Sequence, residues 1–505
     1  MLRALRVVHA VLVVATALLF QTLYLASGNT LHDNGRWLSS KVDLQYGILG
    51  TVAFLTTRTA LHRDRLDLGV WHRYQEVLYR DPVRLASLEA DVRLGEPGYL
   101  VVLFEHTGEG FQGVRLSRDA DHPSACLAGT GEGGFTRRAP LDPGPLDDAW
   151  HRIALVAEAG SYAVTLDGRA VGRCGAPGAQ PGRVGFRGSR ARKIQVDDAV
   201  IRTAGGAQVV EDFANHRHAH AAFALALLGV LAVHGGVLAA SARSRRRTGL
   251  GPQPYLLTTH LVLLACGGLG WTVDALVLRR QHPEHVDFRG HVTTIESKRE
   301  VVARLRASTP RPKPGDVYRI LALGGSQTWG MGARRTEETW FRRLEALLGA
   351  DAPPGLRYEV VSAGIPAYKA PWLYELYTRE WIGLEPDCVL LNVGHNDDDM
   401  EALAASLRAF AAFDRARGIR TVLVPEANST DSRASLHEIE ARQEVVRRVA
   451  AEEDLPLIEM QEPLERRKDE GFLWWDRVHL TSFGQRLLAE QIFAERATLL
   501  GRGAF

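Results

Sequence analysis

The segment VYRILALGGSQTWGMG occupies residues 317–332 and decides the fold of the chain around it. It begins with a mostly apolar, branched run, as in a buried strand, and this run ends at Gly324 and Gly325. Two glycines allow a sharp turn, so Ser326 is placed at the carboxyl end of the strand, where open α/β sheets bind ligands. A serine there can serve as the nucleophile in acyl transfer. An ordinary turn between a strand and a helix explains the segment equally well, so the rest of the chain has to decide.

The chain after this segment alternates between apolar strands and helices, which predicts a parallel sheet covered on both faces. Further strands are predicted at residues 357–361, 388–393, 421–425 and 455–458. Helices are predicted at residues 336–348, 372–382, 401–417, 434–453 and 482–497. In such folds the loops that follow the strands meet at one edge of the sheet, and that edge carries the site.

Three of these loops carry groups that acyl transfer needs. Gly364 follows the second strand and offers an amide with no side chain in the way. Asn396 follows the third strand, and its side-chain amide is a good neutral donor to an oxyanion. After the last strand, His479 can act as a base, and Asp476, three residues earlier, can fix its tautomer.

The blocks GGSQT, SAGIPA, GHND and DRVH follow one another in this order and resemble the SGNH (GDSL-like) serine hydrolase superfamily over residues 317–505. The resemblance implies a three-layer, flavodoxin-like α/β domain that needs neither a cofactor nor a metal ion. It also implies that Ser326 is the nucleophile, His479 the base and Asp476 the residue that orients the base. The amides of Ser326, Gly364 and Asn396 would form the oxyanion hole.

Three positions depart from the pattern of this superfamily. Gly325 stands where an aspartate commonly precedes the serine, and we expect the activity to tolerate this change. Ser362 and Ala367 stand where asparagine and glycine are common, and we expect these changes to alter the wall of the cleft.

Several neighbouring side chains have two interpretations. His395 adjoins Asn396 and could be mistaken for the base, but no aspartate stands at a fixed spacing from it, so a supporting or substrate-binding position is expected. Trp474 and Trp475 could form a wall on which a sugar stacks, or they could pack in the core. The acidic residues 397–399 suggest a cation site, but the start of a helix explains them about as well, and no metal is predicted.

The region at residues 27–217 is predicted to be a β-sandwich, because short alternating runs are separated by Gly, Pro, Asp and Asn from about residue 85 onward. The runs WHRIAL at 150–155 and YAVTLDG at 162–168 resemble the concanavalin-like or laminin-G jelly roll. Members of that group often bind glycans and many act only as spacers, and no ligand residue can be carried over. Cys126 and Cys174 both lie in this region and could form a disulfide.

Three long apolar runs predict transmembrane helices at residues 1–26, 219–242 and 255–278. A cleaved signal peptide is the alternative for the first run. The loop at residues 243–254 is rich in arginine, so the positive-inside rule places it in the cytoplasm. The β-sandwich and the C-terminal domain then both lie on the extracytoplasmic side, and residues 279–316 link the last span to the C-terminal domain.

The composition excludes several other classes of protein. A net charge of +2 over 505 residues gives no basic field for nucleic acid. Four scattered cysteines suit neither a zinc site nor a disulfide framework. The sequence therefore predicts a multidomain, multi-pass protein of the cell membrane whose C-terminal domain is a serine esterase.

The predicted substrate is an O-acetyl or related O-acyl group on an extracytoplasmic polysaccharide or glycoconjugate. Two alternatives stay open. An O-acyltransferase that modifies a cell-envelope glycan would use the same residues, and it would need a separate membrane partner as acyl donor. A non-catalytic surface protein would use the β-sandwich to bind glycan, although the complete set of Ser326, Gly364, Asn396 and His479 argues against it.

Overall fold

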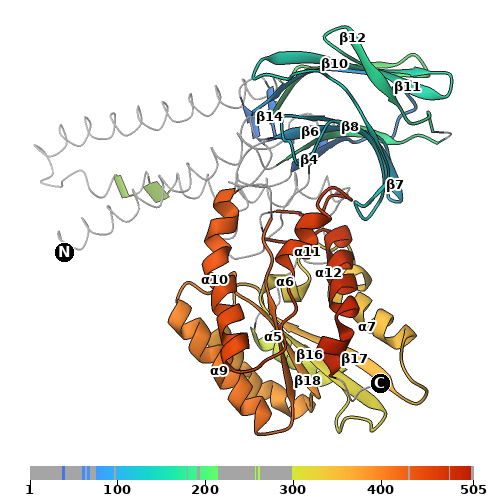
Figure 1. Ribbon diagram of the computed structural model, residues 1–505. Coiled ribbons are helices and arrows are strands. Elements are labelled where there is room, and N and C mark those ends of the chain that lie inside the picture. Colours follow the sequence, from blue (N-terminus) through green and yellow to red (C-terminus); the bar gives the residue numbers. More distant parts are fainter. Residues whose placement is uncertain are drawn as a thin grey trace, which may run out of the picture.

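Two folded units make up the protein, a β-sandwich and a C-terminal α/β domain (Figure 1). The computed structural model describes residues 37–39, 60–62, 65–68, 75–95, 98–178, 180–189, 194–213, 256–257, 260–261, 298–429, 433–476 and 478–501. One hydrophobic cluster joins the two units, because it contains Val101 and Phe111 of the sandwich together with Phe472 and Phe483 of the α/β domain. The two units therefore pack directly against each other.

The predicted membrane helices fall almost entirely outside the described residues. This applies to the runs at 1–26 and 219–242, to the loop at 243–254 and to most of the run at 255–278. Within the described part of the chain, no helix is both long enough and apolar enough to span a bilayer. The three spans stay a prediction.

Two antiparallel sheets form the sandwich (Figure 1). One sheet has the strand order β1-β4-β13-β6-β7-β8-β9, and the other has the order β12-β11-β10-β5-β14-β3-β2, with β15 paired to β14. The strands are β1 Trp37–Ser39, β2 Ala60–His62, β3 Arg65–Asp67, β4 Gln75–Tyr79, β5 Leu85–Leu94, β6 Tyr99–His106, β7 Gly110–Ser117, β8 Ala125–Thr130, β9 Phe135–Pro140, β10 Trp150–Glu158, β11 Ser161–Leu166, β12 Arg169–Cys174, β13 Arg183–Gly188, β14 Ile194–Thr203 and β15 Gln208–Glu211.

Alternating side chains hold these sheets face to face. On β5, Leu88, Ala90, Val92 and Leu94 are buried in the core between the sheets, and the residues between them are only partly buried. The prediction of an antiparallel β domain is confirmed. Its finer resemblance to a concanavalin-like jelly roll stays a prediction.

A disulfide joins Cys126 to Cys174, whose Cα atoms lie 5.3 Å apart. Cys126 lies on β8 in one sheet and Cys174 ends β12 in the other, so the bond links the two layers of the sandwich. The pairing predicted from the sequence is confirmed.

Four parallel strands form the sheet of the α/β domain, in the order β17-β16-β18-β19. They are β16 Val317–Gly324, β17 Arg357–Gly364, β18 Cys388–Val393 and β19 Arg420–Pro425. Every residue of β18 is buried, as expected for a central strand with both faces covered. Separate hydrophobic clusters contain Leu390 and Leu391, successive residues that point to opposite faces of the sheet. The predicted parallel α/β domain is confirmed.

Helices cover this sheet on both faces (Figure 1). The helices are α5 Lys298–Ser308, α6 Ser326–Trp329, α7 Trp340–Ala350, α8 Ala370–Leu376, α9 Met400–Arg415, α10 Arg433–Glu452, α11 Gln461–Arg466, α12 Ser482–Ala494 and α13 Arg496–Leu500, and the short helical turns are η2 Thr336–Glu338, η3 Tyr377–Trp381 and η4 Ile382–Leu384.

The fifth strand predicted at residues 455–458 is reduced to one bridge, between Leu423 and Leu457. The Leu423 N–H donates to the Pro456 carbonyl, and the Ile458 N–H donates to the Leu423 carbonyl, each at 2.9 Å. The segment lies beside β19, but it forms only this short pairing, and Pro456 has no N–H to add to a longer ladder.

Part of the predicted linker at residues 279–316 is helical. It contains α5, whose Val301 and Leu305 are buried in the core of the α/β domain. Helix α5 was not predicted from the sequence, because charged residues surround its narrow apolar stripe. A helix needs only one apolar face to pack on a core.

Candidate active site

Glycine at two positions allows the turn that carries the serine. β16 ends at Gly324, and Ser326 begins α6 directly after Gly325. A Cβ atom on Gly324 would lie 2.0 Å from Thr328 Oγ1 and 2.2 Å from the Asn392 carbonyl oxygen, so only glycine fits there. The turn places Ser326 at the carboxyl edge of the sheet.

Ser326, His479 and Asp476 form a continuous chain of hydrogen bonds. Ser326 Oγ lies 2.7 Å from His479 Nε2, and His479 Nδ1 lies 2.7 Å from Asp476 Oδ2. The backbone N–H groups of Val478 and His479 each donate to Asp476 Oδ1 at 2.8 Å. An ionised carboxylate only accepts, so Nδ1 carries the imidazole proton and Nε2 can accept the proton of the serine hydroxyl.

Asn396 lies beside this serine on the loop after β18. Its Nδ2 donates to the Tyr368 carbonyl at 3.0 Å, which fixes the orientation of the amide. A primary amide has two N–H donors, so the second can serve an oxyanion. Nothing in the sequence pointed to Tyr368, because it acts through its backbone carbonyl.

Gly364 ends β17, directly opposite Gly324 in the register of the sheet. A Cβ atom there would lie 2.3 Å from the backbone nitrogen of Trp329 in α6. The absence of a side chain at Gly364 therefore leaves its amide uncovered and also lets α6, which begins at Ser326, approach β17 closely.

Glu426 is a buried carboxyl behind the Asn396 loop, and its sequence context gave no sign of it. Its Oε2 accepts from the backbone N–H of His395 at 2.7 Å. A Cβ atom on Gly325 would lie 2.6 Å from Asn396 Nδ2 and 3.4 Å from Glu426 Oε1. Burial raises the pKa of Glu426 to about 8. Asn396 and Glu426 thus lie beside Gly325, the position at which SGNH hydrolases commonly have an aspartate.

The ring of His395 contacts the protein backbone. Its Nε2 lies 2.9 Å from the Ala427 carbonyl oxygen, which can only accept, so this nitrogen carries a proton. The structure shows His395 holding the loop after β19 to the loop after β18.

Residues 322–487 match the GDSL-like Lipase/Acylhydrolase family. The C-terminal region is a GDSL-like acylhydrolase domain. The chain is therefore an enzyme, and the alternative of a non-catalytic surface protein is set aside.

Solved structures are similar to this acylhydrolase domain at low identity. An α/β hydrolase enzyme from the metagenome of Lake Arreo, Spain, is 20% identical, with 36% of this chain and 96% of that chain covered and a TM-score of 0.32. An acetylxylan esterase from Geobacillus stearothermophilus is 21% identical, with 37% and 97% covered and a TM-score of 0.32. A two-domain esterase active on acetylated mannans is 20% identical, with 40% and 52% covered and a TM-score of 0.32. A search of curated proteins found no match to the chain.

Trp474 and Trp475, near the predicted base His479, are buried. Trp474 is 3% exposed and Trp475 is 8% exposed, and they belong to the hydrophobic clusters on opposite faces of the domain. The Trp475 ring lies 5.9 Å from the His479 ring. Buried rings offer no open face to a sugar, so the suggested stacking wall is wrong and the two side chains pack in the core.

The acidic run after Asn396 has three separate structural roles. Asp397 Oδ1 accepts from the Ala370 N–H at 2.9 Å, and Asp398 pairs with Lys369 at 2.5 Å. Asp399 caps α9 by accepting backbone N–H groups of the first helical turn. The helix start predicted here accounts for Asp399, and the other two carboxylates tie the loop to the segment before α8.

An open groove borders the same loop. It has a volume of about 750 Å³ and lies between the N-terminal ends of α8 and α9, with Lys369, Trp372, Asp398 and Glu401 in its lining. Trp372 is 48% exposed, so much of its ring can be reached from solvent. Asn396 precedes Asp398 by two residues, and its Nδ2 bonds the carbonyl of Tyr368, the residue before Lys369, so the groove lies near the predicted oxyanion donor.

Proposed function

We propose that this protein is a membrane-anchored serine esterase that removes O-acetyl or related O-acyl groups from an extracytoplasmic polysaccharide or glycoconjugate. The observation that carries the proposal is the chain of hydrogen bonds from Ser326 through His479 to Asp476. Such a chain activates a hydroxyl that is a weak nucleophile by itself.

In the first half of the reaction, Ser326 Oγ attacks the ester carbonyl carbon while His479 Nε2 takes the hydroxyl proton. Asp476 stabilises the imidazolium that forms, and the Ser326 amide, the Gly364 amide and Asn396 Nδ2 stabilise the oxyanion. The intermediate then collapses, and the bond to the alcohol oxygen breaks. His479 returns the proton to that oxygen, and the acyl group stays on Ser326.

In the second half, water takes the place of the alcohol. His479 accepts a proton from the water as its oxygen attacks the acyl carbon. The bond to Ser326 Oγ breaks, Oγ recovers its proton from His479, and the carboxylic acid leaves.

The groove beside Asn396 supports a glycan as the carrier of the acyl group. A pyranose ring has apolar C–H faces and a polar edge of hydroxyls, so it can lie on the exposed indole of Trp372 and donate hydroxyl hydrogen bonds to carboxylates. Asp398 and Glu401 line the same groove and supply such acceptors.

The disulfide between Cys126 and Cys174 supports an extracytoplasmic location, because such bonds persist outside the reducing cytoplasm. The acylhydrolase domain packs on the sandwich that contains this bond, so we place both domains on the same side of the membrane.

The test is the release of acetate by the detergent-solubilised full-length chain from an aryl acetate and from a panel of acetylated oligosaccharides, with Ser326→Ala as the inactive control. We expect release from both substrates by the wild type alone. Product that carries the acetyl group on an added sugar acceptor, with no free acetate, would show an O-acyltransferase instead. Equal activity of wild type and Ser326→Ala would remove the proposal.

The groove has a separate test. Trp372→Ala should raise KM for an acetylated oligosaccharide severalfold more than KM for the aryl acetate, because only the sugar uses the indole face. Trp372→Phe keeps an aromatic face and is the matched control. Equal effects of Trp372→Ala on both substrates would remove Trp372 from the sugar-binding proposal.

A further inference from the structure

The segment that leads into Asp476 lies along an edge of the β-sandwich. The Phe135 N–H donates to the Glu470 carbonyl, and the Phe472 N–H donates to the Gly133 carbonyl, each at 2.7 Å. Between these bonds, Gly134 and Gly471 form an antiparallel bridge. The acylhydrolase domain thus pairs its own backbone with the turn between β8 and β9, in the manner of an added strand.

Charged side chains reinforce this pairing. Arg115 of β7 is 1% exposed in its side chain, and its Nη1 lies 2.8 Å from Asp469 Oδ1. Arg138 of β9 pairs with the other oxygen of the same carboxylate. Lys468 Nζ lies 3.0 Å from Asp121 Oδ2 on the sandwich. Because Arg115 is withdrawn from water, its pair with Asp469 is screened less than a surface ion pair.

Arg187 of β13 contacts the same segment closer to Asp476 along the chain. Its side chain is 2% exposed, and its guanidinium carbon lies 4.0 Å from the centre of the Phe472 ring. Its Nη2 lies 3.5 Å from the Trp474 carbonyl oxygen. The same Phe472 ring stacks on Phe111 of β7, with ring centres 5.4 Å apart.

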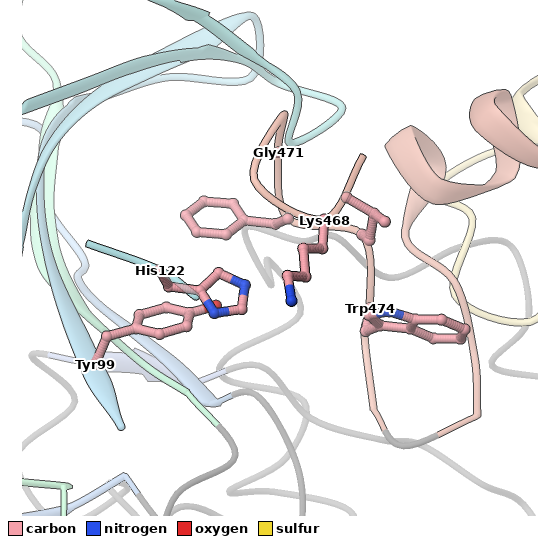
Figure 2. Close-up of a pocket in the computed structure, with 7 residues that line it drawn as sticks. Tyr99, His122, Lys468, Gly471 and Trp474 are labelled. Carbon is pink, nitrogen blue, oxygen red and sulfur yellow. The ribbon is translucent and has the colours of Figure 1, made fainter. Parts of the chain in front are cut away.

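The interface around these contacts is closely packed. In Figure 2, Lys468, Gly471 and Trp474 of the acylhydrolase domain face Tyr99 and His122 of the sandwich. The cavity between them has a volume of about 10 Å³, which is room for about one water molecule. A closely packed interface of this kind transmits a displacement of one side to the other.

From Phe472 the chain forms a narrow hairpin with Asp476 and His479 at its tip. The Thr481 N–H donates to the Leu473 carbonyl, and the Trp475 N–H donates to the His479 carbonyl, at 2.9 and 2.8 Å. The base of this hairpin is therefore the stretch that Arg187 clamps.

We infer that the β-sandwich positions the catalytic hairpin of the acylhydrolase domain, with Arg187 as the central positioning residue through Phe472 and the Trp474 carbonyl. The inference rests on the proposed roles of His479 and Asp476. It gives the sandwich a part in the reaction of every ester substrate, whether or not the substrate contains a sugar. A module that only binds glycan would affect polymeric or oligosaccharide substrates alone.

Arg187→Met in the full-length chain tests the inference, because methionine keeps apolar bulk and removes the guanidinium. We expect kcat to fall about 10- to 100-fold for an aryl acetate and for an acetylated oligosaccharide alike, with KM little changed, since small displacements of catalytic groups have effects of this size. Asp469→Asn should also lower kcat for both substrates, but by a smaller factor.

The matched control is Arg202→Met, because Arg202 lies on β14 in the other sheet and pairs with Glu89 there. Thermal unfolding is recorded for each variant, and if Arg187→Met does not unfold cooperatively, the partly exposed Asp469→Asn decides by the same criteria. Wild-type kcat in the folded variants would overturn the inference. An effect confined to KM of the oligosaccharide, or an equal loss of kcat in Arg202→Met, would overturn it as well.

Discussion

Gln327 donates a hydrogen bond of 2.6 Å from Nε2 to the carbonyl oxygen of Val478, so the residue after Ser326 holds the residue before His479. The same nitrogen donates to the Ala427 carbonyl, also at 2.6 Å. Gln327 is 2% exposed, and both hydrogens of its amide are used. One side chain therefore sets the spacing between the turn of Ser326 and the hairpin of His479.

Gln327→Met should lower both stability and activity. It leaves the Val478 carbonyl without this donor, at about 1–3 kcal/mol if that oxygen stays buried and unsatisfied. The Ala427 carbonyl keeps its bond from His395 Nε2. We expect kcat for an aryl acetate to fall at least tenfold, because the hairpin loses its tie to the nucleophile turn. Gln485→Met is the control, since Gln485 is also buried and bonds Trp340 and Met331 instead. Gln485→Met should be less stable than the wild type in denaturant unfolding, but its loss of kcat should be smaller than that of Gln327→Met. A larger loss of kcat in Gln485→Met than in Gln327→Met would contradict the role of Gln327.

Ser326 and His479 should act as one unit. Ser326→Ala and His479→Ala should each reduce hydrolysis of an aryl acetate by several orders of magnitude, and the double variant should be little worse than either. Asn396→Ala should lose about 10²–10³ in kcat, because one oxyanion donor is removed. His395→Ala should have a mild effect; a loss as large as that of His479→Ala would show that the base has been misassigned.

Gly325→Ala should damage the oxyanion side chain. Its Cβ would lie 2.6 Å from Asn396 Nδ2, so the amide has to move. We expect a loss in kcat for an aryl acetate approaching that of Asn396→Ala, with KM much less affected. The control is Gly349→Ala, because a Cβ atom at Gly349 of α7 meets nothing within 4 Å. Wild-type kcat in Gly325→Ala would show that the amide can shift without consequence.

Glu426 should make the stability of the fold depend on pH. Burial raises its pKa from 4.5 in the unfolded chain to about 8, so the folded state binds the extra proton between these values. Its contribution is complete below about pH 4.5 and is lost as the pH rises through about 8. Glu426→Gln cannot ionise at this position. Between about pH 4.5 and about pH 8, its free energy of unfolding should therefore rise by a few kcal/mol relative to that of the wild type. Asp414, whose pKa burial raises to about 6, titrates in both proteins and cancels in the comparison. A constant difference from pH 5 to pH 8 in denaturant titrations would contradict the prediction.

Removal of the disulfide should destabilise the sandwich. Cys126 and Cys174 are 48 residues apart. Closing a loop of that size lowers the entropy of the unfolded chain, which raises its free energy by about 4 kcal/mol at 25 °C. Cys126→Ser with Cys174→Ser should therefore lower the melting temperature, as should reduction of the wild type. Reductant should have little effect on the melting temperature of the double variant. If the double variant melts at the same temperature as the oxidised wild type, the disulfide does not stabilise the sandwich as expected.

The sequence by itself determined the elements that depend on local pattern. The apolar run before Gly324 and Gly325 requires a buried strand that stops at Ser326, and the alternation on residues 85–94 requires a half-buried strand. The resemblance of the four blocks to SGNH hydrolases implied roles for Ser326, Asn396, Asp476 and His479. Parallel strands bring the loops that follow them to one edge of the sheet, which agrees with a shared site.

Only the tertiary structure decided which distant groups meet. Arg115 and Asp469 are 354 residues apart, and no periodicity relates them. Glu426 reaches the Asn396 loop from the loop after β19, and Tyr368 contributes a carbonyl that every residue type possesses. Trp474 and Trp475 could have faced either solvent or core until packing buried them. Such contacts arise from how separately specified elements pack together, so the position of the catalytic hairpin on the sandwich was beyond the reach of any local pattern.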